Sequence, residues 1–425
     1  MLDVIGVGTV DDLFAQIPEH VRLQGPLGLP AGLSEQEVAA DVAAMAARNR
    51  SAEDLVCFAG AGAYDHFVPA VVWALAGRSE FATSYTPYQP ELSQGVLQAL
   101  FEFQSMLCEL TGLEVANASL YDGATALVEA VHMARSGSGR VLVSGALDPR
   151  LLHTLRTYGR GAGFEPEAWP APDGHGGPPS IEEGVSAVVV QHPNVFGVLE
   201  DVPALAEAAH AAGARLIQVF DPMTLGVLAP PGDMGADIAV AEGQPLGNHL
   251  NFGGPNLGMI AARMKDVRRM PGRIVGQTVD VDGRPGYVLT LQAREQHIRR
   301  EKATSNICTN QTLMALAATV YMAWLGPAGL LEVGEQSAGK AAYLCDRMCA
   351  LEGVQPMFPD TPFLREFAVR LPKPSSHVID EMIPLGFLAG VVAPGAPDGL
   401  LVALTERRTR REMDAFIDAL ALVLA

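Results

Sequence analysis

Positive charge, and lysine above all, is scarce in this sequence. The 425 residues include 29 Lys and Arg against 48 Asp and Glu, which gives a formal net charge of −19. Nucleic acids and anionic membranes attract clustered positive charge, so neither is an expected partner of so acidic a chain. The lysines are only Lys265, Lys302, Lys340 and Lys373. Any chemistry that needs a lysine amine must therefore use one of these residues.

Cysteine is also rare, and its spacing fits neither a disulfide framework nor a zinc site. The five cysteines are Cys57, Cys108, Cys308, Cys345 and Cys349. We expect reduced thiols in a cytoplasmic protein. The ten histidines never stand at helical spacing with a carboxylate between them, so a helix-borne metal site is not expected.

No secretory signal opens the sequence, because its first ten residues lack a basic region and Asp11 and Asp12 follow at once. Residues 303–331 carry no charge, which raises the question of a membrane span. The apolar part, Leu313–Leu325, is shorter than the roughly 20 residues that a span requires. A buried helix is the expected structure.

Hydrophobic residues make up 49% of the chain, which is more than one small core needs. We predict a helical arm over residues 1–75, a large α/β domain over 76–335 and a small α+β domain over 336–425. In the arm, Thr9 and Ser34 are suitable helix caps, each followed by acidic residues, and residues 25–33 form a Pro/Gly-rich connector.

The middle of the chain alternates between apolar strands and helices, which favours a mostly parallel sheet covered on both faces. The predicted strands are 141–144, 187–191, 216–220, 237–240 and 258–261, and the predicted helices are 97–111, 124–135, 151–158 and 204–212. The last part is predicted to hold a helix over 330–351, strands over 367–371 and 400–404, and a final helix capped by Thr409 with Glu412.

Two short motifs have ordinary explanations. Residues 60–65 begin like a dinucleotide-binding loop, but the third glycine is missing and no clear strand precedes them, so we expect a turn. The basic run 407–411 is interpreted as a solvated helix start and not as an anion site.

Three segments carry stronger signals. At Asp122, Gly123 and Thr125 a turn leads into a helix, where free N–H groups and a hydroxyl suit a phosphate or carboxylate, although an ordinary capped helix is equally compatible. Asp221 ends a predicted strand and could pair with the ring nitrogen of a pyridine cofactor or simply cap the turn at Pro222. The glycines in 243–247 and 251–258 allow close approach of a ligand or partner chain, or form plain surface turns.

This order of a strand-end Asp, a further strand and a Gly-rich loop is that of fold-type-I pyridoxal-phosphate enzymes, which need a lysine in the loop. Residues 241–258 contain none. Lys265 lies farther along between Arg263 and Arg268, which suggests a solvated surface. The sequence therefore predicts the frame of a cofactor site without its covalent group.

Five longer motifs resemble subunit 1 of glycine dehydrogenase (decarboxylating), the N-terminal half of the P-protein of the glycine cleavage system. They are Phe58–His66, Tyr85–Glu91, Ser93–Gly95, Asn117–Ala126 and Arg294–Gln311. The resemblance runs from about residue 4 into the C-terminal domain. It implies a fold-type-I pyridoxal-phosphate-dependent transferase fold.

The resemblance also implies an activity and partners. The P-protein decarboxylates glycine on pyridoxal phosphate and passes the aminomethyl group to the lipoyl arm of the H-protein. In two-subunit forms the Schiff-base lysine belongs to subunit 2, and matching the Gly-Gly-Pro motifs puts Gln244 at that position. This chain is then the partner without a covalent cofactor, in a heterotetramer of two copies of each subunit.

The remaining role is to complete the site of the partner. Candidates for contacts to its phosphate or substrate are Tyr85, Thr86, Tyr88, Gln89, Arg299, Thr304, Ser305 and Asn306. These residues could instead merely pack the dimer, and Arg299 or Arg300 could form a cross-chain salt bridge.

The chain departs from the family around the glycine-rich loop. The usual Pro-Leu-Ser-Phe-Gly-Gly-Pro-Tyr reads differently here, and no role is assigned to His249, Asn251 or Asn256. Two other interpretations stay open: a stand-alone pyridoxal-phosphate enzyme that uses Lys265 or Lys302, and a non-catalytic homodimeric binding protein.

Overall fold

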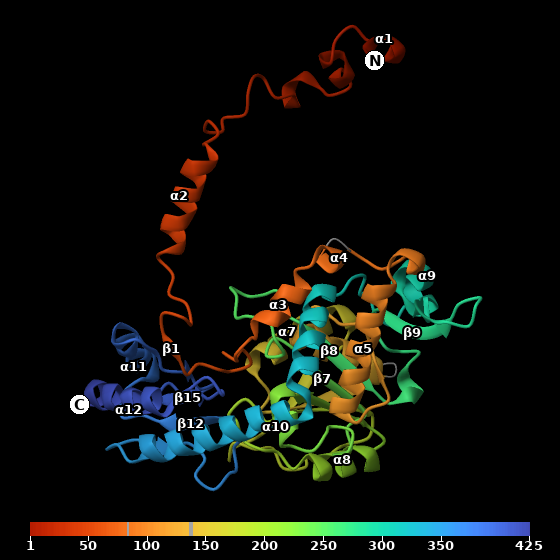
Figure 1. Ribbon diagram of the computed structural model, residues 1–425. Helices are drawn as coiled ribbons and strands as arrows, with labels where there is room; N and C mark the ends of the chain where they lie inside the picture. Colours follow the sequence, from red (N-terminus) through yellow and green to blue (C-terminus); the bar gives the residue numbers. More distant parts are fainter. Residues whose placement is uncertain (83–84, 136–138) are drawn as a thin grey trace. The chain divides into compact units, whose positions relative to one another are not determined.

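The chain divides into two compact units, Met1–Ser51 and Ala52–Ala425. The computed structural model describes residues 1–82, 85–135 and 139–425 (Figure 1). Residues 52–75, which the sequence-based division gives to the arm, belong to the second unit. Their strand β1 (Val56–Cys57) pairs in parallel with β13 (Phe387–Leu388) near the end of the chain.

The first unit consists of short helices and connectors, none of whose residues is buried. The predicted capping box begins α2 (Glu35–Ala46), where the Ser34 hydroxyl accepts from the Glu37 N–H and the Glu37 carboxylate accepts from the Ser34 N–H. Thr9 and Asp12 exchange the same bonds, but the helix there is a single 3-10 turn. Its other elements are α1 (Leu2–Ile5), η1 (Asp11–Phe14) and η2 (Glu19–Val21).

The second unit is built on a seven-stranded, mostly parallel sheet, which confirms the predicted fold class. Only β8 runs against its neighbours. The five strands predicted for the middle of the chain all belong to this sheet, whereas two of its short strands, β2 and β4, were not predicted. In spatial order the strands are β2 (Val115–Ala116), β8 (Gly258–Ala262), β7 (Ile238–Glu242), β6 (Arg215–Phe220), β5 (Val185–His192), β3 (Arg140–Ser144) and β4 (Pro166–Trp169).

Helices cover both faces of this sheet. In β6, Ile217 and Val219 point into a core shared with α6 (Gly123–Ala134) and α7 (Pro149–Ala162). Leu216 and Phe220 point to the other face, toward α8 (Val202–Ala211) and α5 (Gln94–Thr111). The alternation of apolar residues on both sides explains why these strands are continuously hydrophobic.

The kinked helix α10 (Thr312–Cys349) joins the core beside α5 to the core of the C-terminal part. The sequence predicts two separate helices here, and the structure agrees, because Gly326 adopts the non-helical φ +61 and a second helix follows the first across this kink. Its first part packs Met314–Thr319 and Tyr321 into the large core beside α3 (Ala70–Ala76). An 18-residue window is apolar enough to cross a membrane by length and composition, and 33% of it is buried.

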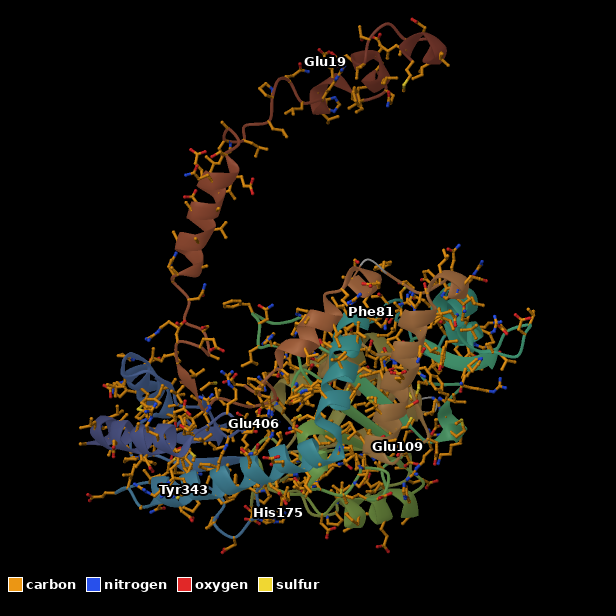
Figure 2. All side chains as sticks on the ribbon, in the orientation of Figure 1. Glu19, Phe81, Glu109, His175, Tyr343 and Glu406 are labelled. Atoms are coloured by element: carbon orange, nitrogen blue, oxygen red, sulfur yellow. The ribbon has the colours of Figure 1, made fainter. Side chains whose placement is uncertain are left out.

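The C-terminal part is a small α+β layer, as predicted. Its antiparallel sheet has the order β11 (Gln355–Pro356), β12 (Glu366–Arg370), β15 (Gly399–Ala403) and β14 (Val391–Val392). It is covered by α11 (Ser375–Met382) and α12 (Arg410–Leu424), and α12 begins at the predicted Thr409–Glu412 capping box. Tyr343 of α10, labelled in Figure 2, donates a hydrogen bond to Asp414 of α12.

The interpretation of residues 407–411 as a solvated face is wrong for its first two members. Arg407 and Arg408 both pair with the buried carboxylate of Asp65, with Arg408 Nη2 3.2 Å from Oδ2.

The remaining elements include an unpredicted hairpin and several single turns: β9 (Ile274–Val279), β10 (Pro285–Thr290), α4 (Ser79–Ala82), α9 (Gln296–Arg299), η3 (Pro90–Leu92), η4 (Pro222–Gly226), η5 (Met264–Asp266), η6 (Gln292–Arg294), η7 (Arg300–Lys302) and η8 (Ile383–Leu385).

Candidate functional site

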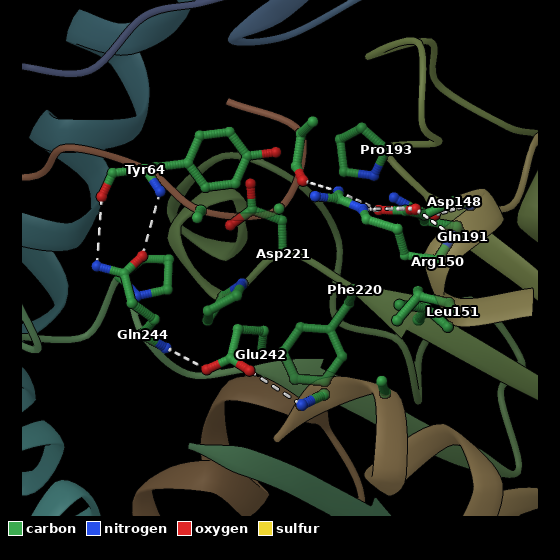
Figure 3. Close-up of a pocket in the computed structure, with 18 of the residues that line it drawn as sticks. Tyr64, Asp148, Arg150, Leu151, Gln191, Pro193, Phe220, Asp221, Glu242 and Gln244 are labelled. Carbon is green, nitrogen blue, oxygen red and sulfur yellow. Dashed lines mark hydrogen bonds and ion pairs between the residues drawn. The ribbon is translucent and has the colours of Figure 1, made fainter. Parts of the chain in front are cut away.

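A cavity of about 290 Å³ lies at the carboxyl ends of β5, β6 and β7 (Figure 3). This edge of an open parallel sheet is where ligands commonly bind. The starts of α6 and α7 and the loop Ala61–Tyr64 form further walls, and Arg365 and Glu366 reach in from the start of β12. The segment at residues 60–65 is a turn, as predicted, although the short strand β1 does precede it.

The predicted anion site at the start of α6 is already occupied by a side chain of the protein. The Asp122 carboxylate accepts from the Thr125 N–H at 2.7 Å, so the helix is capped. The Gly123 N–H donates to Glu242 Oε2 at 3.0 Å. Of the two interpretations, the capped helix is therefore the one found, and Asp122 and Gly123, but not Thr125, line the cavity.

Glu242, which sequence reasoning missed, ends β7 and fills the place of an external anion. In addition to Gly123, it accepts the N–H groups of Gln244 and Leu257, both at 2.9 Å from Oε1. Burial raises the pKa of Glu242 to about 7, although these three N–H groups favour its ionised form. The only signal in the sequence for a role of Glu242 was an acidic residue between an apolar strand and a glycine turn.

Of the two functions that its position suggested, Asp221 shows the turn cap, and its other oxygen pairs with an arginine. Oδ1 accepts from the Met223 N–H at 3.1 Å and so caps the following turn, while Oδ2 pairs with the guanidinium of Arg365. Arg365 is 3% exposed, and its guanidinium carbon lies 3.5 Å from the ring centre of Tyr64. The acid that would face a pyridine nitrogen is thus paired with an arginine.

The same arginine continues into a hydrogen-bonded chain. Its Nη1 lies 2.6 Å from His66 Nε2, and His66 Nδ1 lies 2.6 Å from Glu406 Oε2. Because arginine can only donate, His66 Nε2 accepts and Nδ1–H donates to Glu406. This chain connects the end of β6 with the C-terminal layer.

Glu366 forms the opposite acidic wall. Its carboxylate accepts the Ala61 N–H at 2.7 Å and the Tyr64 hydroxyl at 2.8 Å. Burial raises the pKa of Glu366 to about 7, against the opposing effects of these two bonds and of Arg365.

Gln244, at the position of the expected lysine, is held by backbone hydrogen bonds (Figure 3). Its Oε1 accepts from the Tyr64 N–H at 3.1 Å and its Nε2 donates to the Asn248 carbonyl at 2.7 Å. The first glycine loop packs closely, since Gly247 at φ +85 lies against Tyr321. The second loop is exposed, with Phe252 88% accessible.

The three departures from the family pattern lie in different surroundings. The ring of His249 stacks on Trp73 with 6.2 Å between centres. Asn256 lines the cavity, whereas Asn251 does not.

None of the described residues that line the cavity is a lysine. Lys265 Nζ lies 3.2 Å from Asp237 Oδ1 with its side chain 62% exposed, as the prediction of a solvated surface requires, and Lys302 is exposed in η7. The groups that pyridoxal phosphate needs are a lysine, free donors for its phosphate and an acid for its ring nitrogen. Here the first is absent and the other two are satisfied internally, so these residues do not fit the cofactor.

The residues predicted to serve a partner lie elsewhere, and none of them lines this cavity. Tyr85 and Tyr88 are 81% and 58% exposed. Arg273 joins their loop to the segment after the 304–306 turn, because its Nη2 contacts the Tyr88 hydroxyl at 3.2 Å and the Cys308 carbonyl at 3.0 Å.

The other predicted contact residues are partly accessible. Gln89 precedes the turn η3, and Thr86 has a buried hydroxyl without a partner among the described residues. Thr304, Ser305 and Asn306 form a turn that is exposed at its two ends, and Arg299 donates to the Lys302 carbonyl at 3.3 Å. Within the described part of the chain no three His, Cys, Asp or Glu side chains gather as a metal site.

Comparison with known proteins shows which family this chain resembles. A model of the glycine cleavage system P-protein family matches residues 1–420. A probable glycine dehydrogenase (decarboxylating) subunit 1 of Chlorobium chlorochromatii is 50% identical over 433 residues, covering 100% of this chain and 97% of the relative.

Solved structures agree with this likeness. An inhibitor-bound crystal structure of glycine decarboxylase (P-protein) of the glycine cleavage system has a TM-score of 0.94 and 47% identity, covering 100% of this chain and 97% of that one. An aspartate aminotransferase of Thermus thermophilus, at 18% identity and TM-score 0.60 over 87% of this chain and 98% of its own, shares the fold-type-I architecture alone. The chain therefore belongs to the glycine cleavage system P-protein family, within which it matches subunit 1 of glycine dehydrogenase (decarboxylating).

Proposed function

We propose that this chain is the subunit of the glycine-decarboxylating enzyme that carries no covalently bound cofactor and completes the active site of a second subunit. Together the two subunits would decarboxylate glycine on pyridoxal phosphate held by subunit 2 and transfer the aminomethyl group to the lipoyl group of the H-protein. The observation that carries the proposal is Gln244, held by Tyr64 and Asn248 where the cofactor lysine would stand.

The contribution of this chain would come from its exposed polar loops. The Tyr85–Gln89 loop and the Thr304–Asn306 turn present hydroxyl and amide groups, which suit an anion bound at an interface. Arg273 fixes both segments to one another through Tyr88 and Cys308. We infer that these groups position the substrate or the cofactor phosphate of subunit 2, in a cytoplasmic assembly of two copies of each subunit.

The test compares this chain alone with the co-expressed pair. Alone and with added pyridoxal phosphate, it should show no aldimine absorbance, no adduct after borohydride reduction and no release of CO₂ from glycine. Co-expression with subunit 2 should restore decarboxylation and transfer to lipoylated H-protein. A stoichiometric reducible adduct on Lys265 or Lys302 would refute the proposal and make the chain an enzyme in its own right.

A further inference from the structure

The Thr304–Asn306 turn belongs to a segment that no helix or sheet holds in place. Among the described residues, the backbone groups of 304–310 exchange no hydrogen bond with other backbone groups. Side chains hold the segment instead: at its end the Ser119 hydroxyl accepts from the Gln311 N–H at 3.1 Å and from Asn310 Nδ2 at 2.9 Å. Such a segment takes its position from the rigid elements to which its side chains are bound.

Helix α6 supplies the anchors of the turn itself. The carboxyl group of Glu129 is hydrogen-bonded to the Ser305 hydroxyl, and His132 is hydrogen-bonded to the backbone of Thr304. Residues three apart lie on one face of a helix, so a single face of α6 contacts two successive residues of the turn. The Ser305 oxygen also accepts the Ile307 N–H at 3.1 Å. The direction of this hydroxyl is therefore set from both sides.

Glu129 is an expensive residue for this position. It is 3% exposed, and its neighbours Leu127, Val128 and Ala130 in α6 are fully buried. Its Oε2 has no hydrogen-bond partner among the described residues. A buried acid without a cation is costly, and an apolar side chain would pack here without that cost. The bond to Ser305 is what an apolar side chain could not supply.

We propose that Glu129 is a positioning residue, which fixes the Ser305 hydroxyl and with it the face that the Thr304–Asn306 turn presents to the active site of the second subunit. The inference rests on the proposed function and adds a residue to it. Glu129 itself is buried, so it acts through Ser305 and touches neither the substrate nor the cofactor.

The anchor should respond to pH. Burial raises the pKa of Glu129 to about 7, and only the bond from Ser305 opposes this. Helix α7 and strands β7 and β8 face α6 with apolar side chains. No charged group contributes to the raised pKa, although several titratable residues surround the turn: His132, Arg268, Arg269, Arg294 and Glu295. Above pH 7 a buried, unpaired charge forms, which favours displacement of the turn and entry of water.

The first test is the pH profile of glycine decarboxylation by this chain co-expressed with subunit 2. The amide oxygen of Glu129→Gln still accepts from Ser305 but does not ionise, so this variant should match the wild type at pH 6 and exceed it about tenfold at pH 8. Glu335→Gln, an exposed change on α10, is the control and should follow the wild type at every pH. A profile of Glu129→Gln that equals the wild-type profile would overturn the proposal.

The second test is a double-mutant cycle at pH 6. Glu129→Leu and Ser305→Ala should each lower the rate about tenfold, and the double variant should lose no more than either one. Losses that multiply, or a wild-type rate in Glu129→Leu, would show that the two residues do not act together and would overturn the proposal.

Hydrogen exchange of the chain without subunit 2 separates this inference from the proposed function. In folded Glu129→Leu the amide of Ile307 should exchange about tenfold faster at pH 6, since Ser305 is no longer held, and Glu335→Gln should leave it unchanged. Unchanged exchange in Glu129→Leu would overturn the proposal. Faster exchange together with an inactive wild-type pair would refute the proposed function and still support Glu129 as the anchor of the turn.

Discussion

The cavity and the outer loops both carry polar residues but satisfy them in opposite ways. In the cavity, Asp221, Glu242 and Gln244 are bound by other groups of the same chain. On the outer loops, Tyr85 is 81% exposed and Asn306 is also accessible. The comparison shows that the cavity keeps the architecture of the family while its polar groups bind one another and leave few of them free for a ligand.

This difference affects how much each group contributes to the stability of the chain. Groups that are paired inside the chain contribute to its stability, whereas exposed groups contribute little and remain free for another molecule. Substitutions in the cavity should therefore change the free energy of unfolding, and substitutions on the loops should change only activity in the assembled enzyme.

The largest effect is expected for Arg365→Ala, which leaves the buried His66 and the partly buried Asp221 without their partner. The free energy of unfolding should fall by about 3–5 kcal/mol, since a buried charge is left uncompensated. Denaturant unfolding followed by circular dichroism measures it. Arg370→Ala removes an exposed pair with Asp398 and should cost less than about 1 kcal/mol. Equal losses in both variants would contradict the comparison.

The next effect depends on pH and concerns Glu129, which is 3% exposed. Burial raises the pKa of Glu129 to about 7. The folded state thus holds a proton that the unfolded chain releases near pH 4.5, and the stability this proton contributes is lost as pH rises from 4.5 through 7.

Glu129→Gln should therefore match the wild type near pH 4.5 and be more stable by about 2–3 kcal/mol at pH 8 to 9. Thermal or denaturant unfolding at several pH values tests it. Glu335→Gln, an exposed change, should show no such pH dependence. A difference that is constant with pH would exclude titration of Glu129 as the cause.

A smaller effect is expected for Gly123→Ala at the start of α6. A Cβ atom would lie 2.8 Å from the Glu242 nitrogen, so the strand or helix must shift, at a cost of about 1–2 kcal/mol. Gly161→Ala is the matched control in α7, where nothing lies within 4 Å, and it should stabilise the chain by about 0.5–1 kcal/mol. Stabilisation by both changes would show that the contact with Glu242 is not tight.

The smallest effect on stability is expected for Tyr85→Phe, within about 0.5 kcal/mol of the wild type. If the hydroxyl serves the partner site, glycine decarboxylation by the assembled enzyme should nevertheless fall about tenfold or more. Steady-state rates with both subunits measure it. An unchanged rate, with unchanged assembly, would assign Tyr85 to packing alone.

Much of the fold could be predicted because its signals are local. Continuous apolar runs mark β3, β5, β6, β7 and β8, and capping boxes mark the starts of α2 and α12. The two-residue strand β2 has no such run. The break inside α10 was predictable as well, because Gly326 and Pro327 normally end a helix and the helical geometry does stop at Gly326.

Only part of the site was predictable, because only some of its residues are marked by local signals in the sequence. Asp221, Gly123 and Gln244 follow strands or precede helices, so the sequence places them at one sheet edge. Arg365 and Glu366 could not be found, since their partners Asp221 and Tyr64 are far away in the chain. Arg408 was misjudged because its compensating Asp65 is 343 residues distant.

The helix α10 has a mechanical consequence for the cavity. It begins in the core of the large sheet, ends among Leu344 and Met348 of the C-terminal core, and departs from helical geometry at Gly326. The stiff segment beyond that point is about 35 Å long at 1.5 Å per residue, so a swing of about 10° would move its end by about 6 Å. Arg365 and Glu366 belong to the C-terminal layer, which packs against this segment of α10. Such a swing would move Arg365 and Glu366 relative to the end of β6 and would change the width of the cavity that they line together.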